Sequence, residues 1–240
     1  MLKIENLSKR YEDGKLALDQ LSLHVKKGEI FVLLGANGAG KSTTINLLCN
    51  FIQPTSGSVT LAGKDAFKDS LEARKHLAYV SENVHLYENF TGFENLRFFA
   101  KLCGKNLSRD ELQNTLRDIG LQEDFIHKQV KTYSKGMRQK TGIAVAIVKD
   151  ADLILLDEPF SGLDPKAAYD FQQLLIEMKN RGKAILMSTH NIFKAKKLAD
   201  HIGIMKDGEL VMTRSKDDIE FEDLEKLYLD YMEGRLVSGD

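Results

Sequence analysis

A glycine-rich segment directly after a short apolar run is the most constraining feature of this 240-residue sequence. Residues 30–34 (Ile-Phe-Val-Leu-Leu) are typical of a buried strand, and residues 35–42 (Gly-Ala-Asn-Gly-Ala-Gly-Lys-Ser) have the G-x-x-x-x-G-K-[ST] pattern of a phosphate-binding loop. Glycines let the backbone curl so that N–H groups point at phosphate oxygens, and the following helix directs its positive end at the same anion. The sequence therefore predicts a nucleoside triphosphate site, with Lys41 at the β- and γ-phosphates and the Ser42 hydroxyl on Mg²⁺. The nucleotide-binding residues predicted here are Gly35, Asn37, Gly38, Ala39, Gly40, Lys41, Ser42 and Thr43.

Charge and hydrophobicity exclude several classes of protein. The 34 basic and 35 acidic residues leave a net charge of −1, so no nucleic-acid partner is expected on electrostatic grounds. The two cysteines, Cys49 and Cys103, lack metal or redox spacing and fit a reducing cytosol, and Cys49 is expected to be a buried, inert thiol. The N-terminus lacks the apolar core of a signal peptide, and no apolar stretch approaches the roughly 18–20 residues that span a bilayer. If the protein works at a membrane, another chain must span it.

The hydrophobic pattern separates strand-rich from helical parts of the chain. Strands are predicted at 2–7, 17–25, 30–34, 58–62, 77–80, 153–156 and 184–188, with a hairpin between 202–205 and 209–212. Helices are predicted from residue 41 to about 50, after Asp164-Pro165, and over 220–233, where the helix should pack on its own domain. Residues 88–150 are typical of helices, with capping-box patterns that begin at Thr91 and Ser108.

These elements predict a single domain over 1–240. Its nucleotide-binding core, with a β subdomain, would comprise 1–87 and 151–215, and a helical subdomain over 88–150 would be inserted between strands of that core. Residues 216–240 would form a helical tail.

Two carboxylates follow the apolar strand at 153–156. Because the ends of parallel strands meet at the sheet edge that carries the phosphate loop, Asp157 and Glu158 are expected there. Adjacent strand residues point to opposite faces and need not share a role. We assign Asp157 to the Mg²⁺ shell, through water, and Glu158 to polarising the water that attacks the γ-phosphate. His190 would contact the γ-phosphate, hold the attacking water, or be an ordinary polar residue.

Residues 1–215 resemble the nucleotide-binding subunit of an ATP-binding cassette (ABC) transporter, because several short motifs occur in the same order and at the same spacing as in that family. The phosphate loop corresponds to the family's Walker A and Asp157-Glu158 to its Walker B. The family's signature loop, D-loop and switch-histidine loop resemble residues 133–137 (Tyr-Ser-Lys-Gly-Met), 161–164 (Ser-Gly-Leu-Asp) and 188–190 (Ser-Thr-His). Tyr11 stands where the family has the aromatic residue that stacks on adenine. The resemblance implies an α/β fold: a P-loop NTPase with a RecA-like core, an antiparallel β subdomain and an inserted α-helical subdomain.

The resemblance also implies a mechanism. Two cassettes, identical or different, pair head to tail, and each ATP lies between the Walker A of one and the signature of the other. Ser134 and Gly136, at the start of a helix, would offer a hydroxyl, an N–H and a helix dipole to the partner's γ-phosphate. Asp164 would lie at the dimer seam, act as a plain helix N-cap, or do both. Hydrolysis lets the two cassettes come apart and drives transmembrane permease subunits that are different chains. A cytoplasmic ATPase, peripheral on the inner face of the membrane, is therefore expected.

The Q-loop position and the signature loop depart from the family pattern. Glu82 replaces the Q-loop glutamine, near Mg²⁺ and the contact with the membrane partner, where a carboxylate would ligate the metal. Glu82→Gln is therefore expected to keep ATP binding and to change stimulation by the partner. Lys135 brings a cation toward the partner's nucleotide, while Met137 removes an amide. The stretch 133–140 resembles that of bacterial exporters whose cassette and membrane subunits are separate chains, which favours export by a competent ATPase.

A cluster of apolar side chains follows Glu82, formed by Leu86, Tyr87, Phe90, Phe93, Phe98 and Phe99. About four of the six are expected in the core. The resemblance implies that the rest line a groove for a short cytoplasmic helix of the membrane subunit.

Two other functions stay open. One is a mechanical cassette that acts on nucleic acid or ribosomes, which the single Walker A and the lack of heptads or a basic stripe disfavour. The other is a cassette coupled to a membrane complex that moves nothing.

Overall fold

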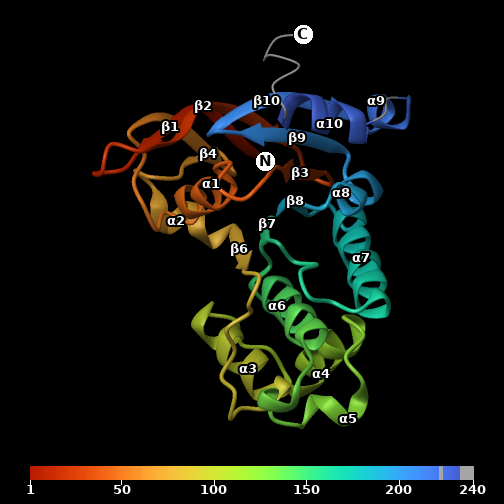
Figure 1. Cartoon of the computed structure of the whole chain (residues 1–240). Helices are drawn as coiled ribbons and strands as arrows, with labels where there is room; N and C mark the ends of the chain where they lie inside the picture. Colours follow the sequence, from red (N-terminus) through yellow and green to blue (C-terminus); the bar gives the residue numbers. More distant parts are fainter. Residues whose placement is uncertain (222–223, 233–240) are drawn as a thin grey trace.

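The protein is described from a computed structural model, which covers residues 1–221 and 224–232. Two β-sheets lie in the upper part of the molecule, and a group of helices projects below them (Figure 1). The larger sheet has six strands in the order β10-β9-β3-β8-β7-β6, and the smaller has four in the order β2-β1-β4-β5. The predicted α/β class is confirmed.

The six-stranded sheet forms the centre of the fold. It consists of β3 (Ile30–Leu34), β6 (Leu77–Val80), β7 (Leu153–Asp157), β8 (Ala184–Thr189), β9 (His201–Lys206) and β10 (Glu209–Ser215). All are parallel to their neighbours except β10, which pairs antiparallel with β9 across the predicted Asp207-Gly208 turn. β3 is buried on both faces, with Val32 in one core cluster and Phe31 and Leu33 in the other. That explains its continuous apolar sequence.

The four-stranded sheet is antiparallel and covers one face of this centre. It contains β1 (Leu2–Arg10), β2 (Leu16–Val25), β4 (Ser56–Leu61) and the short β5 (Lys64–Asp65). Its apolar side chains join those of α1 (Lys41–Leu48) and α2 (Ser70–Lys75) in the second core cluster. The sequence predicted neither α2 nor β5.

The helices below the sheets form what we call the helical lobe. It contains α3 (Gly92–Leu102), α4 (Arg109–Asp118), α5 (Glu123–Ile126), a 3-10 turn (Val130–Thr132) and α6 (Lys135–Lys149). Both predicted capping boxes are confirmed: Thr91 and Glu94 exchange hydrogen bonds at the start of α3, and Ser108 does the same with Glu111 at α4. α6 packs on α3, α4 and β6, so it joins the lobe to the central sheet.

The remaining helices cover the sheet and end the chain. They are α7 (Pro165–Asn180), α8 (Ile192–Leu198), α9 (Lys216–Phe221) and α10 (Leu224–Met232). The helix predicted at 220–233 falls on α9 and α10, while residues 222, 223 and 233–240 lie outside the described residues. Packing of this helix on its own chain is confirmed, because α10 buries Leu224 and Tyr231 in the core. Within the described residues, no helix is long and apolar enough to span a bilayer.

One fully buried polar side chain binds the loop that precedes the first helix of the helical lobe. Asn95 of α3 accepts a hydrogen bond from the Tyr87 N–H (2.8 Å) and donates to the carbonyl oxygens of Tyr87 and Thr91 (both 3.0 Å). The loop from 87 to 91 therefore takes its shape from a side-chain amide inside the lobe.

Asn95→Leu is expected to lower the free energy of unfolding by about 1–3 kcal/mol, because it leaves these buried backbone groups unpaired. Urea unfolding measures the change. The matched control is Asn114→Leu on the exposed side of α4, with an expected change within about 0.5 kcal/mol. Equal losses in the two variants would contradict the role given to Asn95.

Candidate nucleotide site

The register of three parallel strands brings the predicted site residues to one edge of the sheet. Leu34 at the end of β3 pairs with Thr189 of β8, and Asp157 at the end of β7 pairs with Ser188. Gly35, Glu158 and His190 follow directly on these strands. The predicted convergence of the phosphate loop with the two carboxylates is confirmed.

The phosphate loop fits closely against the strands behind it. A Cβ on Gly35 would lie 2.5 Å from the Met205 carbonyl oxygen, and one on Gly40 would lie 2.9 Å from that of Ala17. Gly40 also has a φ of 106°, which glycine adopts without strain. It precedes α1, and among the described residues no side chain caps the first N–H groups of that helix. Those N–H groups and the positive helix end suit a phosphate oxygen.

The side chains predicted to bind nucleotide line one cavity of about 490 Å³. The predicted residues on its wall are Tyr11, Asn37, Gly38, Gly40, Lys41, Ser42, Thr43, Glu82, Asp157 and Glu158, joined by Lys15 and Ala17. Gly35 and Ala39 lie instead in the buried base of the loop. Asn37, Gly38 and Ser42 are exposed, so the loop is open to a ligand.

Lys41 is a buried cation on the wall of this cavity. Its Nζ donates to the carbonyl oxygens of Gly35 (2.6 Å) and Ala36 (3.0 Å) and lies 3.9 Å from Glu158 Oε1. Burial lowers the pKa of Lys41 below its usual value, although the nearby carboxylates of Glu158 and Asp157 oppose this. A phosphate group would stabilise the charged form further.

Glu158 and His190 form a hydrogen-bonded pair beside the cavity. The Nδ1 atom of His190 lies 2.9 Å from Glu158 Oε1, and the Thr189 hydroxyl donates to Glu158 Oε2 (3.3 Å). The Ser188 hydroxyl donates to Asp157 Oδ1 (2.5 Å) and accepts from the Glu158 N–H (3.2 Å). The two carboxylates therefore have separate side-chain partners, and their separate roles stay a prediction.

The oxygen donors on the cavity wall fit Mg²⁺. Ser42, Asp157 and Glu82 offer one hydroxyl and two carboxylates, and phosphate oxygens and water would complete the shell that Mg²⁺ prefers. In the described part of the chain, no group of three or more His, Cys, Asp or Glu side chains could hold a metal by itself.

Glu82 and Lys135, two residues that depart from the family pattern, are partners. Lys135 Nζ lies 3.4 Å from Glu82 Oε1. A hydrogen bond from the Ser161 side chain lowers the pKa of Glu82 most, and the Lys135 ammonium lowers it further. One turn along α6, the buried Gln139 amide donates to the carbonyl oxygens of Ser81 (3.2 Å) and Glu82 (2.8 Å). The start of α6 thus binds the Q-loop by charge and by hydrogen bonds.

The residues assigned to the partner's nucleotide lie elsewhere. Ser134, Gly136 and Asp164 line a separate cavity of about 310 Å³, away from the phosphate loop. Ser134 caps α6 by accepting from the Met137 N–H (3.3 Å), and Asp164 caps α7 by accepting from the Ala167 N–H (2.9 Å). The N-cap role of Asp164 is confirmed, and its place at a dimer seam stays a prediction.

Sequence reasoning gave no individual role to Ser188, Thr189 or Gln139. Ser188 and Thr189 gain their roles from the register between β8 and its neighbours, which a single sequence does not show. Gln139 had one available signal, a polar residue on the apolar face of a predicted helix. Cys49 is buried as predicted, and burial raises the pKa of its thiol to about 12.

The expectation that four of the six apolar residues after Glu82 lie in the core is wrong. All six are half-buried or exposed. Leu86 and Phe93 pack against the core from its edge. The other four contact one another in edge-to-face or tilted ring pairs at the surface: Tyr87, Phe90, Phe98 and Phe99, here called the aromatic cluster.

The sheet, the phosphate loop and the carboxylates define a P-loop NTPase. In a comparison with known protein families, the family described as ABC transporter matches residues 18–161 of this chain. The bacitracin transport ATP-binding protein BcrA of Bacillus licheniformis is 35% identical over 237 residues, which cover 98% of this chain and 75% of that protein. The chain belongs to the ABC transporter family and is an ATP-binding subunit of it.

Solved structures agree with this assignment. An ATP-binding subunit of an ABC transporter superposes with a TM-score of 0.84 at 31% identity, covering 97% of this chain and 99% of that one. The ATP-binding cassette MJ0796, as a dimer in a post-hydrolysis state with ADP and Pi, gives a TM-score of 0.80 at 28% identity, covering 90% and 99%. The predicted P-loop NTPase fold is confirmed.

The contact between Glu82 and Lys135 is expected to contribute a coupling energy of about 0.2–1 kcal/mol, since both side chains are partly exposed. Urea unfolding of Glu82→Gln, Lys135→Gln and the double variant gives this energy as a double-mutant cycle. Lys131→Gln, on the exposed turn before α6, combined with Glu82→Gln serves as the control. Strict additivity of Glu82→Gln with Lys135→Gln would show that the two charges do not interact.

Proposed function

We propose that this chain hydrolyses ATP as one half of a head-to-tail cassette pair and powers a separate transmembrane permease. The observation that carries the proposal is the division of the site. Lys41, Glu158 and the phosphate loop line one cavity, while Ser134 and Gly136 line another in the same chain. Each cavity holds half of the groups that surround a triphosphate, so two chains would complete two sites.

Glu158 is the group we assign to the attacking water. A carboxylate is acceptor-only when ionised, so it can take a proton from water. With Glu158 ionised, the contact requires the His190 proton on Nδ1, and a neutral ring then offers Nε2 as an acceptor for the second proton of that water. His190 is then a positioning residue for the water and for Glu158.

Lys41 and Ser42 would hold the triphosphate and its metal. The Nζ of Lys41, now bonded to carbonyl oxygens of its own loop, would bind β- and γ-phosphate oxygens. Ser42, Asp157 and Glu82 would hold Mg²⁺, which supplies charge neutralisation at the phosphates. Tyr11 lies on the wall of the same cavity, where its ring would stack on adenine.

The signature end of α6 would complete the partner's site. Ser134 presents a hydroxyl at the N-terminus of a helix 15 residues long, and Gly136 lies in its first turn, where a Cβ would be only 3.0 Å from the Ala167 Cβ. Lys135 adds a cation beside them. Loss of the γ-phosphate removes the anion that both cassettes bind, so the pair would separate after hydrolysis.

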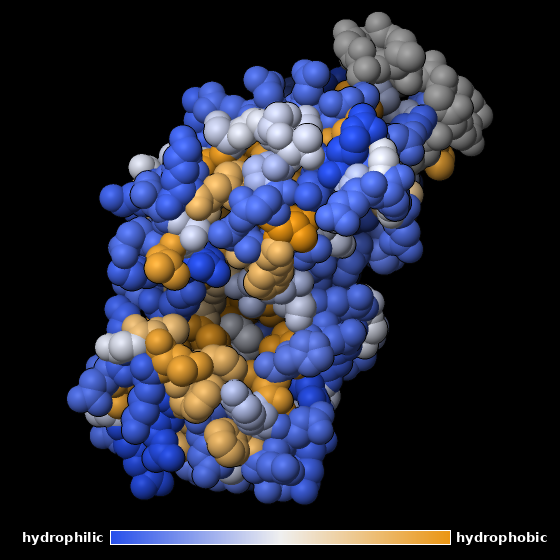
Figure 2. Space-filling model, turned by 90° about the vertical axis from the view of Figure 1, so that its left-hand side faces the viewer, coloured by the Kyte–Doolittle hydropathy of each residue, from blue (hydrophilic) through white to orange (hydrophobic). Residues whose placement is uncertain are grey.

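The aromatic cluster is the surface we assign to the membrane subunit. Tyr87 and Phe90 are 49% and 39% exposed, and both rings contact that of Phe98 on α3 edge to face. Figure 2 shows hydrophobic side chains on this face, gathered below a hollow between the two parts of the molecule. Clustered aromatic residues at a surface are typical of protein interfaces.

The location of the chain and the direction of transport are part of the same proposal. The chain would lie at the cytoplasmic face of the cell membrane and contact it through the permease. Export is proposed from the variant signature stretch at 133–140. The core with its β subdomain is assigned to 1–87 and 151–215, the helical subdomain to 88–150 and the tail to 216–240.

Glu158→Gln is expected to lower the rate of ATP hydrolysis by about a hundredfold or more, because the amide cannot act as a base. ATP binding should persist, so size-exclusion chromatography with ATP and Mg²⁺ should show a trapped dimer of twice the monomer mass. Lys41→Ala is the control and should lose both binding and dimer. Full hydrolysis in Glu158→Gln, or a monomer with bound ATP, would contradict the proposal.

Tyr87→Ser is expected to abolish co-purification of a stoichiometric multi-span membrane subunit with the tagged cassette in detergent. The matched control is Tyr169→Ser on α7, where the tyrosine is 61% exposed but lies outside the aromatic cluster. Mass spectrometry identifies the co-purifying chains in the Glu158→Gln background. Ribosomal proteins or nucleic acid in place of a membrane subunit would favour a mechanical cassette instead.

A further inference from the structure

Lys9 is a cation that contacts a ring of the nucleotide site from outside the nucleotide cavity. Its Nζ lies over the Tyr11 ring, 5.3 Å from the ring centroid. Tyr11 lines the nucleotide cavity, whereas Lys9 does not. The Lys9 ammonium therefore covers one face of the ring and leaves the cavity side of the ring free.

A backbone group holds the Lys9 ammonium in this position. The Nζ donates a hydrogen bond to the Gln53 carbonyl oxygen at 2.8 Å, and Lys9 is half-buried. A lysine side chain has many rotamers in solution, and this bond restricts them. The ammonium cannot leave the Tyr11 ring without losing its hydrogen bond, so the contact between Lys9 and the ring is a built feature of the fold.

The same segment, residues 53–55, also binds the backbone at the end of β1. The Arg10 N–H donates to Thr55 Oγ1 (2.8 Å), and the Thr55 N–H donates to the Ser8 carbonyl oxygen (2.8 Å). Segment 53–55 follows α1, the helix that begins at the phosphate loop. The strand that leads into Tyr11 is therefore anchored to the chain that leaves the phosphate loop.

The turn between β1 and β2 fixes the backbone of Tyr11 from the other direction. The Tyr11 N–H donates to the Lys15 carbonyl oxygen at 2.9 Å, and the Gly14 N–H donates to the Tyr11 carbonyl oxygen at 3.0 Å. The Tyr11 backbone and one face of its ring are thus both held by contacts within the protein. A ligand that binds on the free face does not have to order this side chain first.

A cation behind an aromatic ring also changes the electrostatics in front of it. The faces of aromatic rings carry partial negative charge, so two rings placed face to face repel one another. The Lys9 ammonium is attracted to the π-electrons of Tyr11 and offsets part of that negative charge. A flat aromatic ligand should therefore stack on the free face of Tyr11 more tightly than on a tyrosine without the cation.

We propose that Lys9 is a positioning residue for the nucleotide base: it holds the Tyr11 ring from behind and strengthens the stacking of the base on the opposite face. Lys9 itself does not touch the nucleotide. This inference rests on the proposed stacking of adenine on Tyr11 and adds the group that prepares the ring for it.

Binding of ADP and of pyrophosphate separates the base from the phosphates. Isothermal titration calorimetry gives the dissociation constant of ADP directly and that of pyrophosphate by competition with ADP. Lys9→Met keeps a linear side chain without the charge and is expected to weaken ADP binding about three- to fivefold. The affinity for pyrophosphate should not change, because Lys9 lies outside the cavity.

Lys9→Arg and Lys3→Met are the matched controls. Arginine keeps a cation over the ring, so ADP affinity should stay within about twofold of that of the unaltered protein. Lys3 is an exposed lysine of the same strand, 2.7 Å from Glu5, and its replacement should change neither dissociation constant. Lys9→Gln provides a second neutral variant if Lys9→Met fails to fold.

Two results would overturn the role of Lys9. One is unchanged ADP affinity in Lys9→Met and in Lys9→Gln. The other is a loss of the same factor for ADP and for pyrophosphate, since Lys9 would then support the phosphate loop or the fold as a whole and not the base.

A double-mutant cycle with Tyr11→Leu shows whether Lys9 acts through the ring. Tyr11→Leu should weaken ADP binding, and Lys9→Met should weaken it no further in that background. The same factor in both backgrounds would also overturn the inference. Unchanged ADP affinity in Tyr11→Leu would reject the proposed adenine contact itself, whereas a loss in Tyr11→Leu without one in Lys9→Met would reject only the role of Lys9.

Discussion

The register of β8 between β3 and β7 is the constraint on which the site depends. Thr189 lies beside Leu34 and Ser188 beside Asp157, so the residues that follow each strand emerge at one level. Ser188 then binds both the Asp157 carboxylate and the Glu158 N–H from inside the sheet. Because these strands are buried on both faces, the register is fixed by packing as well as by the ladder. The position of Glu158 relative to the phosphate loop is therefore a property of the core.

Local patterns were enough to predict most elements of the fold. The phosphate loop, both capping boxes and the Asp207-Gly208 hairpin each depend on a few neighbouring residues, and the structure shows all of them. The roles of Ser188 and Gln139 could not be predicted in this way, because their partners lie 30 or more positions away in the chain. The aromatic cluster was misjudged for a related reason. Composition alone does not show which side of a helix lacks a neighbour.

Glu82 and Lys135 acquire a meaning only as a pair. Each departs from the family pattern, and separately each would add an unbalanced charge next to a triphosphate. In the structure the two charges face one another, and the buried Gln139 binds the backbone at Ser81 and Glu82. Replacement of Glu82 by a neutral glutamine would therefore remove the charge contact with Lys135 of α6 as well as a candidate metal ligand. The pair links the edge of the nucleotide cavity to the helix that carries the signature residues.

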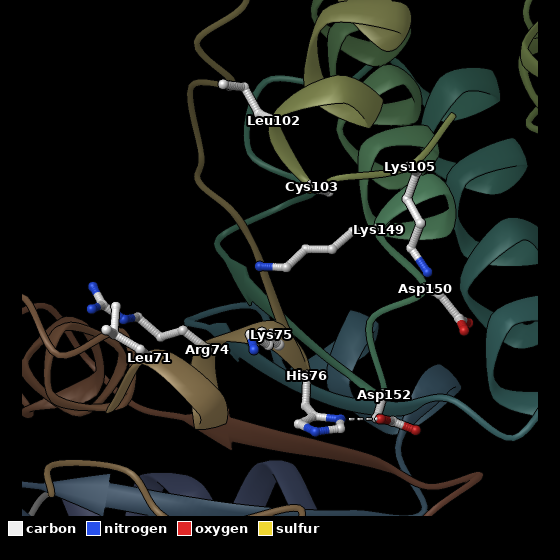
Figure 3. Close-up of a pocket in the computed structure, with 10 residues that line it drawn as sticks. All are labelled: Leu71, Arg74, Lys75, His76, Leu102, Cys103, Lys105, Lys149, Asp150 and Asp152. Carbon is white, nitrogen blue, oxygen red and sulfur yellow. Dashed lines mark hydrogen bonds and ion pairs between the residues drawn. The ribbon is translucent and has the colours of Figure 1, made fainter. Parts of the chain in front are cut away.

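α6 connects the signature residues to the Q-loop and to the far end of the helical lobe. It begins next to Ser134, contacts the Q-loop through Gln139, and ends at Lys149, on the wall of a cavity that Arg74 of α2 also lines (Figure 3). A helix of 15 residues is a rigid rod about 22 Å long, so its two ends move together. A displacement of α6 at Ser134 would therefore also shift Lys149 relative to Arg74 of α2, which lines the same cavity. The signature residues, the Q-loop contact and the far end of the helical lobe are thus joined mechanically through one helix.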